Sequence, residues 1–144
     1  MKILKILTPK RLLGNAGEKK AAGFLRSHGY IILERNYVSQ AGEIDIVAEK
    51  GDTLVFVEVK TRSADKRSPI EPRPASAITP EKQRKIIYAA KQYKLKNQSD
   101  KKMRFDVIEV IKERDNKGKD IFNITHLIDA FNANTAKMSY TKGY

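Results

Sequence analysis

Hydrophobic residues recur along the chain with two different spacings, one typical of helices and one typical of strands. Apolar side chains at every third or fourth position predict an amphipathic helix over residues 16–28, with Gly29 as its C-terminal stop. We place the start of this helix at Asn15, which can accept hydrogen bonds from the first backbone N–H groups, and interpret Glu18 as its capping-box partner. A second helix is predicted over residues 79–96, because it begins with a cap residue followed by proline.

Four further segments carry the β-branched and aromatic residues that favour strands, and polar or glycine-containing turns separate several of them. A fifth strand over 122–124 and a short helix over 127–132 complete the prediction. The stretch 63–78 holds three prolines and no periodicity, so we expect a mobile loop there. The four main strands are predicted over residues 30–38, 43–48, 53–61 and 104–111.

This order of elements, αβββαβ with a further strand and helix after it, predicts an α/β fold. One mixed sheet should lie between helices on both of its faces. At 144 residues the chain has the length of one ordinary domain. We therefore expect a single domain over residues 14–132, preceded by an N-terminal extension, residues 1–13, and followed by a polar C-terminal tail, residues 133–144.

Charge changes this picture, because the chain has 29 basic and 17 acidic residues and a net charge of +12. Residues 60–104 hold 14 basic and 4 acidic residues, so ten of the twelve excess charges lie in the middle of the chain. A localised basic surface suggests a polyanion as partner, with nucleic acid as the first candidate. The chain has no cysteine for thiolate chemistry and no apolar run long enough to span a bilayer, so we expect a cytoplasmic protein without a membrane partner.

Two acidic residues interrupt otherwise apolar strand segments. Asp45 lies between two isoleucines and Glu58 between two valines, with Lys60 on the same face as Glu58. If Ala48 pairs with Thr53 across the turn, the diagonal from Asp45 to Glu58 is about 7–8 Å. Carboxylates this close repel unless a cation joins them, and hard cations such as Mg²⁺ or Mn²⁺ prefer oxygen ligands. The pattern therefore predicts a divalent metal site, with Lys60 placed to orient a nucleophile or to stabilise developing charge.

A purely structural interpretation of these residues stays open at this point. Charged side chains usually lie on solvated surface, so Asp45, Glu58 and Lys60 could belong to an exposed sheet face. The near-continuous apolar runs around the two acids favour function, because such runs are typical of strands covered on both faces. For Glu18, helix capping explains the residue completely without any catalytic role.

Five segments together resemble a known family: GE at 17–18, GEIDIVA at 42–48, VFVEVKTRS at 55–63, RFDVIEV at 104–110 and HLIDAF at 126–131. They are similar to the bacterial YraN-like proteins of the PD-(D/E)xK restriction-endonuclease-like superfamily, and the layout is similar to that of archaeal Holliday-junction resolvases. G-E-I-D followed by a twelve-residue gap and E-V-K is specific, whereas E-x-K alone is not. Ile44 stands where the nominal motif has proline, and the likeness spans about residues 14–131.

The resemblance implies a restriction-endonuclease-like core and a role for each matching residue. Asp45 and Glu58 would be metal ligands, and Val59 would contribute its carbonyl oxygen. Lys60 would be the catalytic lysine, and Glu18 a further acidic residue of the site. The metal would be Mg²⁺ or Mn²⁺, and the reaction would be hydrolysis of phosphodiester bonds.

Basic residues that follow the motif are our candidates for contacts with the phosphates of nucleic acid. They lie at the end of the third strand, in the loop after it and in the first turns of the second helix. Each one individually could equally belong to a solvated helix face or loop. The group consists of Arg62, Lys66, Arg67, Arg73, Lys82, Arg84 and Lys85.

Two functional hypotheses from different classes follow. The first is a metal-dependent DNA endonuclease, structure-specific for branched or junction DNA. Because one domain offers one site, cutting both strands requires either a homodimer or sequential nicks. The alternative is a non-catalytic nucleic-acid-binding module that retains the nuclease fold, and whose binding is indifferent to the carboxylates.

Overall fold

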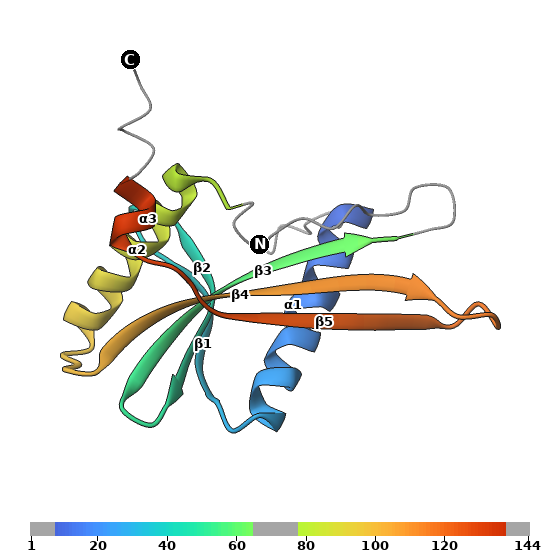
Figure 1. Ribbon diagram of the computed structural model, residues 1–144, viewed down its shortest axis with the longest axis horizontal. Helices are drawn as coiled ribbons and strands as arrows, with labels where there is room; N and C mark the ends of the chain where they lie inside the picture. Colours follow the sequence, from blue (N-terminus) through green and yellow to red (C-terminus); the bar gives the residue numbers. More distant parts are fainter. Residues whose placement is uncertain (1–7, 65–77, 138–144) are drawn as a thin grey trace, which may run out of the picture.

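The computed structural model describes residues 8–64 and 78–137, which form a five-stranded sheet with one long helix on each face (Figure 1). The predicted α/β class, with a mixed sheet flanked by helices, is confirmed. The elements in chain order are α1 (Pro9–Ser27), β1 (Ile31–Val38), β2 (Glu43–Lys50), β3 (Thr53–Ser63), α2 (Pro80–Lys96), β4 (Lys102–Arg114), β5 (Asp120–Phe131) and α3 (Ala133–Lys137).

The strands lie in the sheet in the same order as in the chain, from β1 to β5. The first three form an antiparallel meander, β3 and β4 are parallel, and β4 and β5 are antiparallel. The parallel pair needs a crossover, which α2 provides. Figure 1 shows β4 and β5 extending as a long hairpin away from the end of the sheet that α2 covers. After β5 comes α3, whose residues were expected in the polar tail and instead pack beside α2.

Both long helices begin with the same Thr-Pro signal. The hydroxyls of Thr8 and Thr79 each accept a hydrogen bond of 3.1 Å from the N–H group three residues later. The predicted start of the first helix at Asn15 is therefore wrong, and residues 9–13, expected in the N-terminal extension, are its first turns. Because Glu18 lies in the middle of this helix, its predicted capping role is wrong as well.

The predicted helix over 127–132 is wrong, because β5 continues to Phe131. The β4–β5 ladder has a bulge within this stretch of β5, where Asp129 has a left-handed φ of 55°. The bulge turns Leu127, Ala130 and Phe131 toward the same core cluster. Their spacing of three and four residues therefore imitates the periodicity of a helix.

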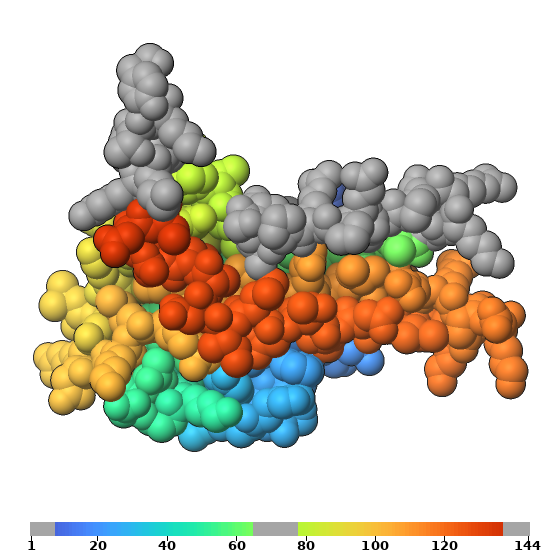
Figure 2. Space-filling model, in the orientation of Figure 1, coloured from blue at the N-terminus to red at the C-terminus, as the bar shows by residue number. Residues whose placement is uncertain are grey.

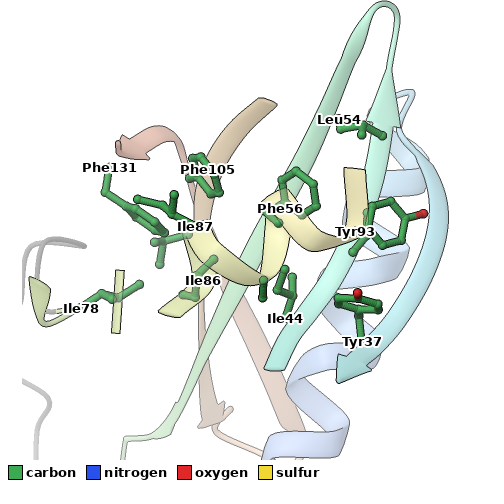
Figure 3. Packing of buried hydrophobic residues seen from close by; sticks show 14 of the residues in the cluster. Tyr37, Ile44, Leu54, Phe56, Ile78, Ile86, Ile87, Tyr93, Phe105 and Phe131 are labelled. Atoms are coloured by element: carbon green, nitrogen blue, oxygen red, sulfur yellow. The ribbon is translucent and has the colours of Figure 1, made fainter. Parts of the chain in front are cut away.

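A row of aromatic rings lies between α2 and the sheet (Figure 3). Tyr37 of β1 contacts Tyr93 of α2, which contacts Phe56 of β3, with ring centroids 5.2 and 5.9 Å apart. Phe105 and Phe131 continue the row across β4 and β5, at 5.7 and 5.3 Å. Such pairs contribute about 0.5–1.5 kcal/mol each beyond the burial of their surface. The row therefore ties α2 to four of the five strands.

The other face of the sheet is covered by α1, which approaches β3 through small residues. Gly17, Ala21 and Ala22 are buried against the sheet. A Cβ atom on Gly17 would lie 1.9 Å from the Oγ1 atom and 2.8 Å from the Cβ atom of Thr61. Only glycine allows this close approach, which fixes the distance between α1 and the strand that carries Glu58.

Replacing Gly17 with alanine should destabilise the protein, although alanine is the better helix former. The clash with Thr61 should cost about 1–3 kcal/mol of unfolding free energy, which offsets the ~1 kcal/mol gained in helix propensity and leaves a net loss of up to about 2 kcal/mol. Gly23 of the same helix is the matched control, because a Cβ atom there meets nothing within 4 Å. Urea unfolding should show Gly23→Ala at least as stable as wild type and Gly17→Ala less stable; equal stability of the two variants would contradict the packing described here.

Candidate metal site and nucleic-acid surface

The two acidic residues of the motif lie where β2 and β3 separate. Lys50 pairs with Thr53 around a two-residue turn whose glycine has a φ of 60°, and this shifts the predicted register by two residues. One step beyond the last paired residues, the same register places Asp45 directly opposite Glu58. The predicted diagonal arrangement is therefore wrong, and the two carboxyl groups are closer than it implied: they hydrogen-bond to each other.

The backbone pairing of β2 with β3 ends at Ile46 and Val57. Beyond this pair, a side chain of β2 accepts the hydrogen bond from β3. The Oδ2 atom of Asp45 accepts a hydrogen bond of 2.8 Å from the N–H group of Val59. On an extended strand the N–H and C=O groups of one residue point toward the same neighbouring strand. The carbonyl oxygen of Val59 therefore points to the β2 side of β3, the side that also holds the carboxyl group of Asp45.

Glu58 is an acid in a buried position, with only 7% of its surface exposed. Burial and the adjacent charge of Asp45 raise the pKa of Glu58 to about 8. Burial also raises the pKa of Asp45, while hydrogen bonds from Val59 and Glu58 lower it. The raised pKa of Glu58 favours its protonated form near neutral pH, and a cation that binds both carboxylates has to displace that proton.

Two lysines face this acidic pair. Lys60 is half-buried on β3, and its charge lowers the pKa of Glu58. Lys82, in the first turn of α2, has its Nζ atom 3.9 Å from the Oε1 atom of Glu58 and lowers the same pKa more strongly. The sequence suggested Lys82 only as a phosphate contact. The structure adds Lys82 to the carboxylate site, because the Thr-Pro start of α2 lies beside Glu58 on β3.

Glu18 lies at the same site, reached from α1. Burial and the charge of Asp45 raise the pKa of Glu18, whereas Arg35 at 3.8 Å and a hydrogen bond from Asn36 lower it. The charge of Glu43 raises it further. Glu18 therefore lies within electrostatic reach of Asp45, although within the described residues the three acids do not form a group that could hold a metal together.

The chemistry of the donors fits a magnesium-like ion. Among the residues that the structure describes, no group of three or more Asp, Glu, His or Cys side chains could hold a metal. Asp45 and Glu58 offer two carboxylates, and Val59 offers a carbonyl oxygen. Mg²⁺ commonly takes only one or two carboxylates and completes its coordination with water and substrate oxygens. Zinc prefers nitrogen and sulfur ligands, which this site does not offer within the described residues.

The remaining basic candidates differ in their surroundings. Arg62 donates to Glu109 at 2.7 Å, and Arg84 donates to the carbonyl of Ala136 at 2.9 Å, so both have partners within the fold. Lys85 is exposed and pairs at 3.6 Å with a glutamate one turn earlier. Exposed pairs of this kind contribute little stability and exchange readily. The other three, Lys66, Arg67 and Arg73, lie outside the described residues.

Sequence reasoning missed a second buried acid, Asp106 on β4. Arg104 donates to it at 2.9 and 2.7 Å, His126 lies at 2.8 Å, and the N–H group of Asp129 donates at 2.9 Å. Although burial raises the pKa of Asp106, the hydrogen bonds from His126 and Arg104 hold it below its ordinary value. The network fastens the bulge of β5 to β4, so its role is structural. The i, i+2 spacing of Arg104 and Asp106 was the available signal.

Comparison with known sequences matches the chain to "Uncharacterised protein family UPF0102" over residues 17–110, a span that contains every candidate metal ligand and Lys60. A UPF0102 protein of Chlorobium phaeobacteroides is 42% identical over 125 residues, which cover 85% of this chain and 94% of the relative. One from Chlorobium limicola is 45% identical over 122 residues, covering 83% and 91%. One from Caldicellulosiruptor saccharolyticus is 45% identical over 113 residues, covering 78% and 92%.

Proposed function

The chain belongs to uncharacterised protein family UPF0102, as the YraN-like motifs suggested, and we propose that it is a metal-dependent endonuclease that hydrolyses phosphodiester bonds in DNA. One observation carries the proposal: Asp45 and Glu58 lie opposite each other in a largely buried position beside Lys60, where burial raises the pKa of both. Buried like charges destabilise a fold, so a purely structural role gives no account of them. A cation that replaces the proton of Glu58 and binds both carboxylates accounts for their burial.

Each residue of the site has a definite task in this reaction. Asp45, Glu58 and the carbonyl of Val59 would hold the ion, which when bound supplies a Lewis acid and lowers the pKa of its water. Lys60 binds a non-bridging phosphate oxygen and stabilises the charge that develops there. Glu18, whose pKa is raised by burial and by the charge of Asp45, orients the attacking water through a hydrogen bond.

The charge of the chain supports DNA as the partner. Ten of its twelve excess positive charges lie in residues 60–104, the stretch that begins at Lys60 and includes α2. Over the stretches 8–64 and 78–137, no helix has both the length and the apolar character needed to cross a membrane. We further propose branched or junction DNA as the substrate. A second copy of the chain would then supply the second cut, because residues 8–64 and 78–137 of each chain form one carboxylate site.

The test is cleavage of labelled linear, flapped and four-way DNA by the purified protein. We expect cleavage with Mg²⁺ or Mn²⁺ and none with EDTA, and the branched substrates should be cut faster than the linear one. Binding that falls with salt but yields no cleavage with either metal would favour the non-catalytic module instead.

A further inference from the structure

One ridge of α2 carries four lysines and a tyrosine at i, i+3 spacing. The ridge starts beside the carboxylate site, where the Nζ atom of Lys82 is 3.9 Å from Glu58. Rows of this spacing are inclined to the helix axis by about 45°, so the ridge crosses the outer face of α2 and leads away from the site. Its members are Lys82, Lys85, Tyr88, Lys91 and Lys94.

The ridge enters a groove between α2 and α3, two helices that lie side by side in Figures 1 and 2. The groove has a volume of about 190 Å³. Its floor is apolar, two cationic side chains stand at its edge, and the ring of Tyr88 is 56% exposed. The lining residues are Arg84, Ile87, Tyr88, Lys91, Ala133 and Ala136.

The occupant of this groove has to combine negative charge with a flat apolar surface. The cations of the ridge select an anion, and the tyrosine ring with its apolar surroundings selects a planar group. A single nucleic-acid strand has both, because its phosphates repeat along the backbone and its bases are free to stack on aromatic side chains. Duplex DNA keeps its bases inside the helix and cannot offer one to the groove.

We propose that this ridge guides a single nucleic-acid strand from the carboxylate site across α2, with an unpaired base stacked on Tyr88 in the groove. The exposed pair between Lys85 and Glu81, at 3.6 Å, opens to admit a phosphate. The proposal deepens the proposed function and rests on it, since it makes an unpaired segment near the cut part of the recognised substrate.

The test measures binding in EDTA, so that no cleavage occurs, with a fluorescently labelled single-stranded DNA oligonucleotide. Tyr88→Ala should weaken binding about 5–150-fold, because stacking on an aromatic ring contributes about 1–3 kcal/mol per base. Tyr88→Phe keeps the ring and should bind like wild type. Leu95→Ala is the control, because Leu95 is 81% exposed on the same helix and does not line the groove. Lys91→Ala should reduce the slope of log affinity against log salt by about 0.7.

Several outcomes would overturn the inference. They are a wild-type protein that does not bind single strands, a Tyr88→Ala variant that binds them as tightly as wild type, and an equal loss of affinity for blunt duplex DNA. The proposed function fails in a different way: a protein that binds single strands through Tyr88 and cleaves no DNA would support the groove and refute the nuclease.

Discussion

Replacing Asp45 with asparagine should reduce DNA cleavage by about 10³-fold or more. The asparagine oxygen can still accept the 2.8 Å hydrogen bond from Val59, so the strands should stay in place. The variant loses the negative charge that holds the cation. A bound ion contributes several kcal/mol of transition-state stabilisation, and each 1.36 kcal/mol changes the rate tenfold. Single-turnover cleavage with Mg²⁺ or Mn²⁺ measures the effect.

Two further variants make this result specific. Asp52→Asn removes a carboxylate from the exposed β2–β3 turn and should cleave like wild type. Lys60→Ala should lose about 10²–10³-fold in rate and still bind Mn²⁺, because its charge acts on the reacting phosphate and it is no metal ligand. Asp45→Asn cleaving at the rate of Asp52→Asn would refute the assigned site.

Replacing Glu58 with glutamine should stabilise the metal-free protein at pH 8. The pKa of Glu58 is about 8 in the folded state against an ordinary value of 4.5, so the folded state holds this proton more tightly than the unfolded chain. Raising the pH from about 5 to 8 therefore lowers the unfolding free energy, by at most about 5 kcal/mol. Glutamine never ionises, so the unfolding free energy of the variant does not fall in this way as the pH rises. The variant should exceed wild type by a few kcal/mol at pH 8 and approach it near pH 5.

Urea unfolding in EDTA at the two pH values measures this difference. Glu113→Gln is the control, because Glu113 is exposed on β4 and its replacement should change stability by less than about 0.5 kcal/mol. Added Mn²⁺ should then stabilise wild type and leave Glu58→Gln unaffected. If Glu58→Gln is no more stable than wild type at pH 8, Glu58 does not hold a buried proton.

The carboxylate site was the most predictable part of the molecule. Asp45 and Glu58 interrupt apolar strand segments, and this contrast is visible in the sequence without any long-range information. The start of α2 was equally clear, because Thr79 and the proline after it signal a helix locally. The same Thr-Pro signal stands at Thr8, so the start of α1 is also encoded locally, although Asn15 and Glu18 form a competing capping pattern within the helix.

Other features could not be predicted because they depend on contacts between distant segments. The register of β2 and β3 depends on whether the turn holds two residues or four, and the local sequence is compatible with both. The bulge at Asp129 gives a strand the periodicity of a helix. Lys82 reaches Glu58, and Arg62 pairs with Glu109, only once the sheet and α2 are assembled.

The central claim is that Asp45 and Glu58 hold a divalent cation in place of the proton of Glu58. Calorimetric titration with Mn²⁺ at pH 7, in two buffers of different ionisation enthalpy, tests it most directly. We predict that wild type binds the ion with release of about one proton, and that Asp45→Asn does not bind it. A wild-type protein that binds no Mn²⁺ even with a DNA analogue present, or an Asp45→Asn variant that binds it as tightly, would contradict the account.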